Sequence, residues 1–134
     1  MPTDPIIYVI DDDEAVRQSL EFLLTTAGMT ARSFESAKAF FDVLADAEFG
    51  CVITDVRMPG DMDGLALAEW IKANRPGVEV IVTSGDALAK DVADQSLQFV
   101  AFLPKPYTGR ALLDLVIQAL AKRAPDIGGA AGAA

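Results

Sequence analysis

Five short strand-like runs, each followed by a segment with helical periodicity, limit the fold of this chain more than any other feature. The strand-like runs cover residues 5–10, 30–34, 51–54, 78–83 and 99–103. Helices are expected at residues 13–27, 36–47, 65–74, 87–97 and 108–123, the last with an apolar stripe formed by Leu112, Leu113, Val116, Ile117 and Leu120. Apolar strands joined by helices are typical of a parallel sheet that helices cover on both faces. The sequence therefore predicts an α/β fold of five β–α units with a doubly wound parallel sheet.

Length and composition restrict the number of domains and the class of partner. With 134 residues, 51% of them apolar, the chain can build the core of one domain. The 11 Lys and Arg residues against 20 Asp and Glu give a formal net charge of -9, which argues against direct nucleic acid binding and against anionic membranes. The chain contains no histidine, which excludes Ser-His-Asp and Cys-His catalysis and argues against a zinc site.

The single cysteine and the first residues indicate the compartment. Cys51 cannot form an internal disulfide and opens an apolar run, so we expect a buried core residue in a reducing environment. The opening MPTDPII lacks the basic and long apolar segments of a signal peptide, and no apolar run reaches the ~18 residues of a membrane span. We therefore expect a cytoplasmic protein.

Polar side chains gather where the predicted strands end. Asp11 and Asp12 follow the first strand, Asp55 follows the third, Thr83 ends the fourth, and Lys105 comes just after the fifth. Ligands of open parallel sheets bind outside the carboxyl ends of the strands, at the point where the strand order reverses. With the order 2-1-3-4-5, the three aspartates would meet in one crevice, with the threonine and the lysine beside it.

The chemistry of this group favours a metal ion and a phosphoryl group. Three neighbouring carboxylates repel one another, and a hard divalent cation such as Mg²⁺ removes the conflict because it prefers oxygen ligands. The ammonium of Lys105 adds a second positive charge. A cation, an ammonium and a hydroxyl together suit the oxygens of an incoming phosphoryl group, which one carboxylate would accept.

Four motifs in order resemble a known family. They are VIDDDEAVR, CVITDVRMPGDMDGLALAEWI, VIVTSGDA and FLPKPY, and together they resemble the receiver domain of two-component response regulators, of chemotaxis-regulator or FixJ type. The resemblance covers residues 5–123 and implies the flavodoxin-like strand order 2-1-3-4-5. We expect a receiver domain at residues 1–124, followed at 125–134 by a flexible low-complexity tail or the start of a linker.

The resemblance also implies the role of each site residue. Asp55 would accept the phosphoryl group. Asp12 would bind Mg²⁺ directly and Asp11 through water, and the ligand set would be completed by Asp55 and the backbone carbonyl of Arg57. Lys105 would contact a phosphoryl oxygen, and its bond to the following Pro106 would be cis.

The same resemblance implies a switch. The phosphoryl donor would be a histidine kinase or a histidine phosphotransfer protein. Thr83 would bond the phosphoryl group, and Phe102 would rotate into the space that Thr83 leaves. The surface of the fourth helix, fifth strand and fifth helix would then change and control an output protein or domain, with a phosphorylation-dependent homodimer as one outcome. Such a domain transfers the group to itself and loses it again, so it is not a turnover enzyme.

Four features depart from the commonest family pattern. Asp13 adds a third acid, which we interpret as a helix cap, and the loop MPGDMDG is one residue longer than usual. Position 102 is Phe rather than Tyr, so the switch ring has no hydroxyl. Arg57, two residues after the acceptor, could position or block the water that attacks the phosphorylated form.

Three other functions stay open at this point. The run DDDEA resembles the Asp-x-Asp of haloacid-dehalogenase phosphatases, with Asp11 as nucleophile and Asp13 as acid/base, but Ala15 stands where Thr or Val is expected and Asp55 would be idle. A flavodoxin-like FMN site would need a Ser, Thr and Gly-rich loop in place of the acidic one. A receiver-like domain that only binds a partner would not need the complete acidic set.

Overall fold

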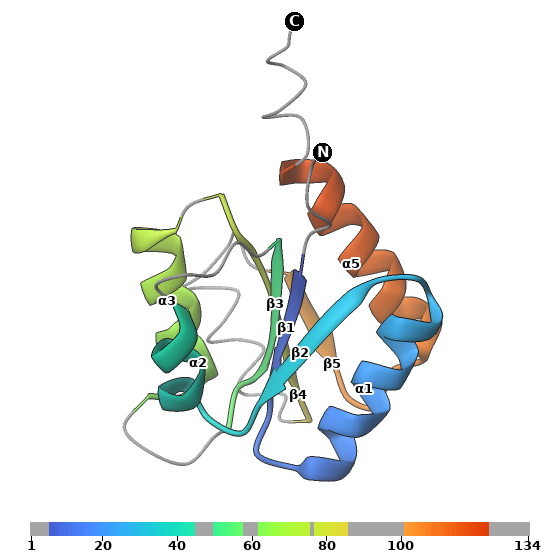
Figure 1. The fold of residues 1–134 in the computed structure, drawn as a ribbon, viewed down its shortest axis with the longest axis horizontal. Coiled ribbons are helices and arrows are strands. Elements are labelled where there is room, and N and C mark those ends of the chain that lie inside the picture. Colours follow the sequence, from blue (N-terminus) through green and yellow to red (C-terminus); the bar gives the residue numbers. More distant parts are fainter. Residues whose placement is uncertain (1–5, 45–49, 58–61, 76, 86–100, 124–134) are drawn as a thin grey trace, which may run out of the picture.

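The computed structural model describes residues 6–44, 50–57, 62–75, 77–85 and 101–123 (Figure 1). The helix predicted at 87–97 and the tail at 125–134 lie outside these residues. So do residues 45–47 of the second predicted helix and residues 99 and 100 of the fifth predicted strand.

A single sheet of five parallel strands forms the centre of the molecule. Its order is β2-β1-β3-β4-β5, which confirms the predicted order 2-1-3-4-5. The strands are β1 (Ile6–Ile10), β2 (Thr30–Phe34), β3 (Cys51–Asp55), β4 (Glu79–Ser84) and β5 (Ala101–Pro104). In the register, Asp55 lies opposite Thr83, and Thr83 lies opposite Leu103. The ends of the third, fourth and fifth strands are therefore level with one another.

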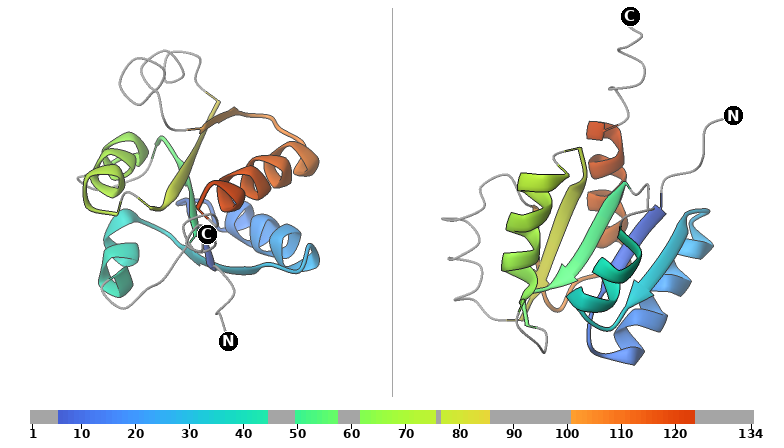
Figure 2. Two further views of the ribbon diagram at one scale, coloured as in Figure 1. Left: turned by 90° about the horizontal axis from the view of Figure 1, so that it is seen from above. Right: turned by 60° about the vertical axis from the view of Figure 1, so that its left-hand side comes forward.

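Helices cover both faces of the sheet (Figures 1 and 2). One face carries α1 (Glu14–Thr26) and α5 (Gly109–Arg123), and the other carries α2 (Ala37–Leu44) and α3 (Gly64–Asn74). This is the doubly wound arrangement that the alternating pattern predicts. Within the described part of the chain, no helix has the length and apolar character needed to cross a lipid bilayer.

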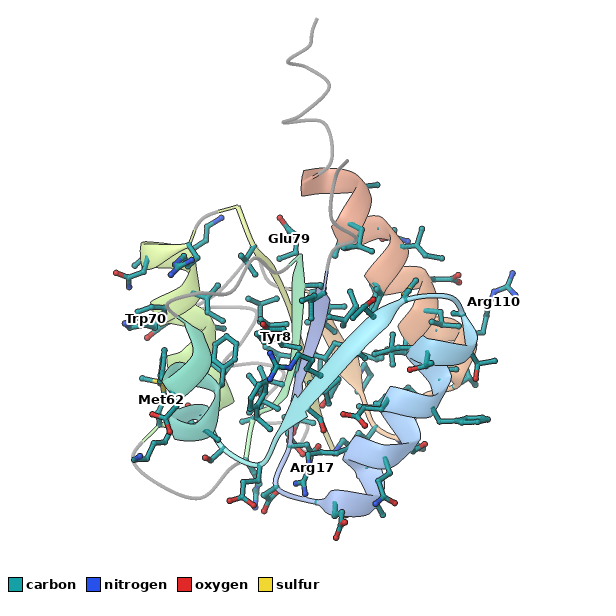
Figure 3. The ribbon with its side chains drawn as sticks, viewed as in Figure 1. Tyr8, Arg17, Met62, Trp70, Glu79 and Arg110 are labelled. Carbon is teal, nitrogen blue, oxygen red and sulfur yellow. The ribbon has the colours of Figure 1, made fainter. Side chains whose placement is uncertain are left out.

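The two helical layers pack on cores of different composition. On the α2 and α3 side, Tyr8, which is labelled in Figure 3, makes aromatic contacts with Phe40 and Phe34. The ring centroids of Tyr8 and Phe40 lie 5.4 Å apart in an edge-to-face arrangement. On the α1 and α5 side, the fully buried residues are aliphatic apart from the predicted core cysteine Cys51. Side chains that alternate along β1 pack into one core or the other, because successive residues of a strand point to opposite faces of the sheet.

Local capping residues set where the helices begin and end. The Asp13 carboxylate accepts from the backbone N–H of Ala15 and begins α1, which confirms the predicted cap. Ser36 and Thr108 cap α2 and α5 in the same way. After α1, Gly28 adopts φ 86°, a left-handed conformation that glycine accepts without steric cost.

The predicted stripe of α5 is wrong at one position. Leu112 and Val116 are fully buried, whereas the Ile117 side chain is 54% exposed. A step of one residue turns about 100° around a helix, so Val116 and Ile117 cannot both face the sheet.

Candidate functional site

The four buried polar residues of the described chain all lie where central strands end. They are Asp11 after β1, Thr54 near the end of β3, and Thr83 and Ser84 at the end of β4. We call this row, with Asp12, Asp55 and Lys105, the carboxyl edge. Burying a polar group without a partner is costly, so such a cluster needs contacts of its own.

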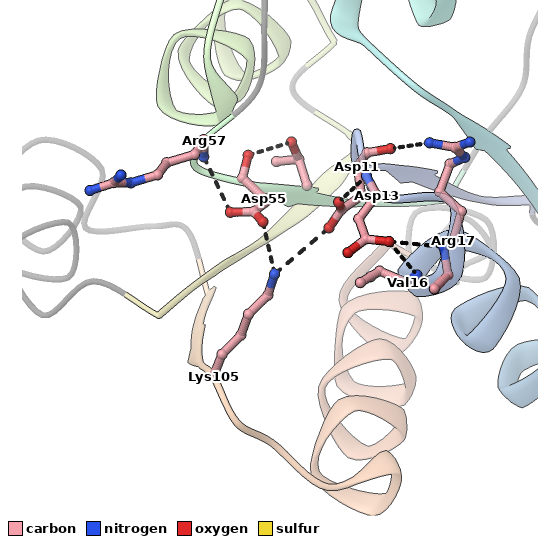
Figure 4. Close-up of polar contacts among 9 residues, drawn as sticks. Asp11, Asp13, Val16, Arg17, Asp55, Arg57 and Lys105 are labelled. Carbon is pink, nitrogen blue, oxygen red and sulfur yellow. Dashed lines mark hydrogen bonds and ion pairs between the residues drawn. The ribbon is translucent and has the colours of Figure 1, made fainter.

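Lys105 joins two of the predicted acids. Its Nζ donates a hydrogen bond to Asp55 Oδ2 at 2.8 Å and lies 3.8 Å from Asp11 Oδ2 (Figure 4). The backbone N–H of Lys105 donates to the carbonyl of Ser84 at 2.8 Å, which fixes the start of the loop after β5. The bond between Lys105 and Pro106 is cis, as the family resemblance implies. The amine, Asp11 and Asp55 therefore meet at one point, as the sequence predicts.

The Asp55 carboxylate is held from two sides. Its Oδ1 accepts from the backbone N–H of Arg57 at 3.2 Å, while Oδ2 accepts from Lys105. The Arg57 guanidinium points away from this carboxylate (Figure 4). Thr83, 2% exposed, lies directly across from Asp55 on β4, and the Val56 N–H donates to the Thr83 carbonyl at 3.0 Å. The acceptor candidate and the hydroxyl candidate thus share one level of the sheet.

The charges at this edge shift the pKa values of their neighbours. Burial raises the pKa of Asp11, and the nearby charges of Asp55 and Asp12 raise it further, against the lowering effects of the Asp13 N–H and Lys105. Burial opposes the charge of Lys105, but the hydrogen bond and the charge of Asp55 outweigh it, so the pKa of Lys105 is raised. The edge therefore holds an excess of negative charge that one lysine only partly balances.

The loop between β1 and α1 presents Asp11 and Asp12 differently. Asp11 is 3% exposed, and its Oδ1 accepts from the Asp13 N–H at 2.9 Å, which leaves Oδ2 facing Lys105. Asp12 is exposed, and its side chain makes no hydrogen bond or ion pair with any residue that the structure describes. Its carboxylate is therefore available to solvent or to a ligand.

The donor set fits a hard divalent cation. Carboxylates at positions 11, 12 and 55 and the Arg57 carbonyl would offer oxygen alone, the ligand type that Mg²⁺ prefers. Among the residues that the structure describes, no three Asp, Glu or Cys side chains stand close enough together to enclose a metal ion. The Lys105 amine instead lies between Asp11 and Asp55, so these side chains would have to turn for a cation to bind.

Two contacts at the carboxyl edge escape the sequence analysis. Arg17 of α1 donates from Nη1 to the Asp11 carbonyl at 2.7 Å. Gly64, the first residue of α3, packs so closely on β3 that a Cβ there would clash with the Asp55 carbonyl oxygen. The glycine after the capping Asp63 was a visible signal, because glycine is a poor helix former. The arginine had no comparable local signal.

Phe102 and a neighbouring groove complete the surroundings. Phe102 is half-buried against the aromatic core on the α3 side. A groove of about 780 Å³ opens beside Lys105, between α1 and the loop after β5, and its lining includes the side chains of Phe22 and Tyr107. Phe22 is 74% exposed, which is unusual for a large aromatic residue.

Comparison with known proteins places this arrangement among signalling domains. The sequence model of the response regulator receiver domain matches residues 7–117. Transcriptional regulatory protein FixJ of Bradyrhizobium diazoefficiens is 40% identical over 126 residues, which cover 93% of this chain and 61% of that protein. The DNA-binding transcriptional regulator NtrC of Escherichia coli K12 is 38% identical over 117 residues, 86% of this chain and 24% of that protein. The chain thus spans less than two thirds of these relatives.

Solved structures give the same result for the fold. Full-length FixJ from B. japonicum superposes with a TM-score of 0.82 at 38% identity, covering 97% of this chain and 64% of that one. A CheY-like receiver domain protein from Methanospirillum hungatei superposes with a TM-score of 0.82 at 26% identity, covering 92% of this chain and 99% of that one.

Proposed function

This chain belongs to the response regulator receiver domain family, and from that premise we propose that Asp55 is its phosphoryl acceptor. Receiver domains are phospho-accepting switches of two-component signalling, so the chain is a signalling domain. The observation that carries the assignment is the 2.8 Å hydrogen bond from Lys105 Nζ to Asp55 Oδ2. It puts an ammonium on the carboxylate that ends β3, beside the second acid Asp11.

The proposed reaction uses Asp55 as a nucleophile. An Asp55 oxygen forms a bond to phosphorus as the bond from phosphorus to the nitrogen of a donor phosphohistidine breaks. Lys105 and the Thr83 hydroxyl contact the phosphoryl oxygens, where charge is greatest. Mg²⁺, when bound by Asp11, Asp12, Asp55 and the Arg57 carbonyl, supplies further positive charge. Attack of water on the acyl phosphate then restores the carboxylate.

The proposed switch follows from the position of Thr83. A hydroxyl drawn toward a phosphoryl group on Asp55 leaves space at the end of β4, and Phe102 of the neighbouring strand would turn into it. The surface around β5 and α5 would then favour an output partner or a second copy of the chain. A shift from 1:99 to 99:1 between two states needs about 5.5 kcal/mol of differential stabilisation.

The partners and setting are likewise part of the proposal. A histidine kinase or phosphotransfer protein would donate the group, and an output protein or domain would respond, as expected for a signalling domain without steady turnover. The apolar groove beside Lys105 suits contact with a protein donor better than with a small phosphate ester. We place the chain in the cytoplasm, with residues 1–124 as the receiver and 125–134 as a tail or linker start.

The rival functions lack support in the same residues. In a haloacid-dehalogenase-like phosphatase, Asp13 would have to act as acid/base, but its carboxylate accepts from the Ala15 and Val16 N–H groups as the cap of α1. An FMN phosphate would meet the acidic loop at positions 11 to 13. A domain that only binds a partner would have no use for a lysine bonded to Asp55.

The acceptor assignment is tested by labelling with radioactive acetyl phosphate in the presence of Mg²⁺. We expect Asp55→Asn to abolish the label, because an amide cannot form the acyl phosphate. The matched control is Asp42→Asn, which makes the same chemical change at a carboxylate that is 66% exposed on α2, and it should label like the parent chain. Undiminished labelling of Asp55→Asn would remove Asp55 as the acceptor. Steady phosphate release that Asp11→Asn abolishes and Asp55→Asn leaves intact would favour the phosphatase.

A further inference from the structure

Arg17 contacts both ends of the acidic loop between β1 and α1. Its backbone N–H donates to the Asp13 carbonyl at 3.0 Å, within the first turn of α1. Its guanidinium reaches back over that turn and donates to the Asp11 carbonyl at 2.7 Å (Figure 4). The loop from Asp11 to Asp13 is therefore closed by one residue that forms no part of the proposed chemistry.

The contact has a clear physical reason. Asp11 comes directly after the last residue of β1, where the chain turns away from the sheet and a carbonyl no longer has a regular ladder partner. Asp11 is almost fully buried, so a carbonyl there requires a donor. A guanidinium supplies a charge-assisted hydrogen bond, which is stronger and more directional than one from a neutral donor. No ion pair joins Arg17 to another residue of the described chain, so the bond to the Asp11 carbonyl is the polar contact that holds the guanidinium there.

The Asp11 carbonyl belongs to the peptide unit that leads into Asp12. Because that unit is planar, a hydrogen bond that fixes its oxygen also fixes the direction in which the chain enters Asp12. The Asp12 side chain makes no hydrogen bond or ion pair with other described residues, so its direction depends on the backbone that carries it. Asp11 is held separately, through its Oδ1 and the Asp13 N–H.

We propose that Arg17 is a positioning residue, whose guanidinium holds the peptide between Asp11 and Asp12 so that both carboxylates meet Mg²⁺ together. This inference rests on the proposed Mg²⁺ site. Partners of metal ligands that do not touch the metal commonly contribute about 10-fold or more to affinity, because they fix the ligands in a binding geometry.

The proposal and simple electrostatics predict opposite results when the charge is removed. Arginine repels a metal cation, so loss of its charge should by itself tighten Mg²⁺ binding to neighbouring carboxylates. Loss of a positioning residue should weaken Mg²⁺ binding, because Asp12 would no longer be held in place. The sign of the change therefore separates the two roles.

The experiment is a calorimetric titration of the unphosphorylated chain with Mg²⁺ alone. We expect Arg17→Met to weaken Mg²⁺ binding about 10-fold and Arg17→Lys to recover part of the loss. The control is Arg110→Met, the same change at an arginine that is 85% exposed on α5 and forms an ion pair with Asp114 one turn away, and it should bind Mg²⁺ like the parent. Circular dichroism melting would verify that each variant is folded.

The outcomes separate this inference from the function on which it rests. Unchanged or tighter Mg²⁺ binding by Arg17→Met overturns the positioning role. Asp12→Asn, titrated alongside, should lose Mg²⁺ binding. If Asp12→Asn binds Mg²⁺ like the parent, the proposed metal site is wrong and the role of Arg17 falls with it, whereas the labelling of Asp55 would still be decided by its own experiment.

Discussion

The middle of strand β1 and the residue that follows it are equally buried and chemically opposite. Tyr8, Val9 and Ile10 are at most 1% exposed and pack in the two cores, whereas Asp11, next in the chain, is 3% exposed and carries a carboxylate. The same change occurs along β4, from Ile81 and Val82 to Thr83. Strand interiors and the carboxyl edge thus share one sheet but differ in the type of side chain they bury.

This difference separates stability from chemistry. Burial of an apolar side chain in the strand interiors stabilises the fold by about 1.5–3 kcal/mol. Burial of Asp11 at the edge raises its pKa, which means that the folded environment disfavours its charge. The edge therefore costs stability that the interiors must supply, and the two regions should respond differently to mutation.

The largest effect is expected from the aromatic core. Phe40→Ala removes a fully buried ring that contacts Tyr8 and Phe34, and we expect a loss of about 3–5 kcal/mol in the free energy of unfolding. Urea titration would measure this loss. The matched control is Phe22→Ala at a ring that is 74% exposed, with an expected change near zero. If interiors and edge are separable, the labelling rate of folded Phe40→Ala equals that of the parent, and a markedly slower rate would contradict the separation.

Gly64 lies at the boundary between the strand interiors and the carboxyl edge. A substitution there should therefore affect both the stability and the labelling rate. A Cβ at this position would lie 2.9 Å from the Val56 Cα and closer still to the Asp55 carbonyl, so β3 or α3 must move. We expect Gly64→Ala to cost about 1–3 kcal/mol of stability. We also expect slower labelling of the folded protein, since a displaced acceptor can lower a rate by about 100-fold.

The same methyl group can be added where space is open. A Cβ at Gly77 would meet no heavy atom within 4 Å, so Gly77→Ala should leave both the urea midpoint and the labelling rate close to the parent values. Equal behaviour of the two alanine variants would show that the close approach of α3 to the acceptor strand is unimportant.

A pH-dependent effect on stability is expected from Cys51, the first residue of β3. Burial, with the charge of Glu79, raises the pKa of the Cys51 thiol to about 12. Above an ordinary thiol pKa of about 8.5 the unfolded chain loses this proton while the folded chain keeps it, so stability falls as pH rises, by at most about 1.4 kcal/mol per pH unit. We expect the free energy of unfolding of Cys51→Ala to fall less steeply between about pH 9 and about pH 11. Parallel slopes for the parent and the variant would contradict this pKa shift.

What the sequence could predict was decided by how local each signal is. Strand runs, the Asp13 cap and the Gly28 helix end depend on neighbouring residues, and the structure confirms them. The meeting of Lys105 and Asp55, 50 residues apart, needed the strand order, which the family resemblance supplied.

The remaining contacts depend on how a helix is placed on the sheet. The reach of Arg17 to the Asp11 carbonyl and the approach of Gly64 to Asp55 are set by the angle and height of α1 and α3, which no periodicity encodes. Ile117 was misassigned for a related reason, because a helical pattern with adjacent apolar residues does not determine which of them faces the sheet.

The level register of the last three strands has a consequence for how a signal would leave Asp55. Backbone hydrogen bonds join Val56 to Thr83 at 3.0 Å and Lys105 to Ser84 at 2.8 Å, so the ends of β3, β4 and β5 are bonded to one another. Two inter-strand steps, about 10 Å in all, separate the acceptor from the border strand β5. A displacement of Asp55 would therefore be shared by three segments that are distant in sequence. It would pass from strand to neighbouring strand through these hydrogen bonds, rather than along the chain.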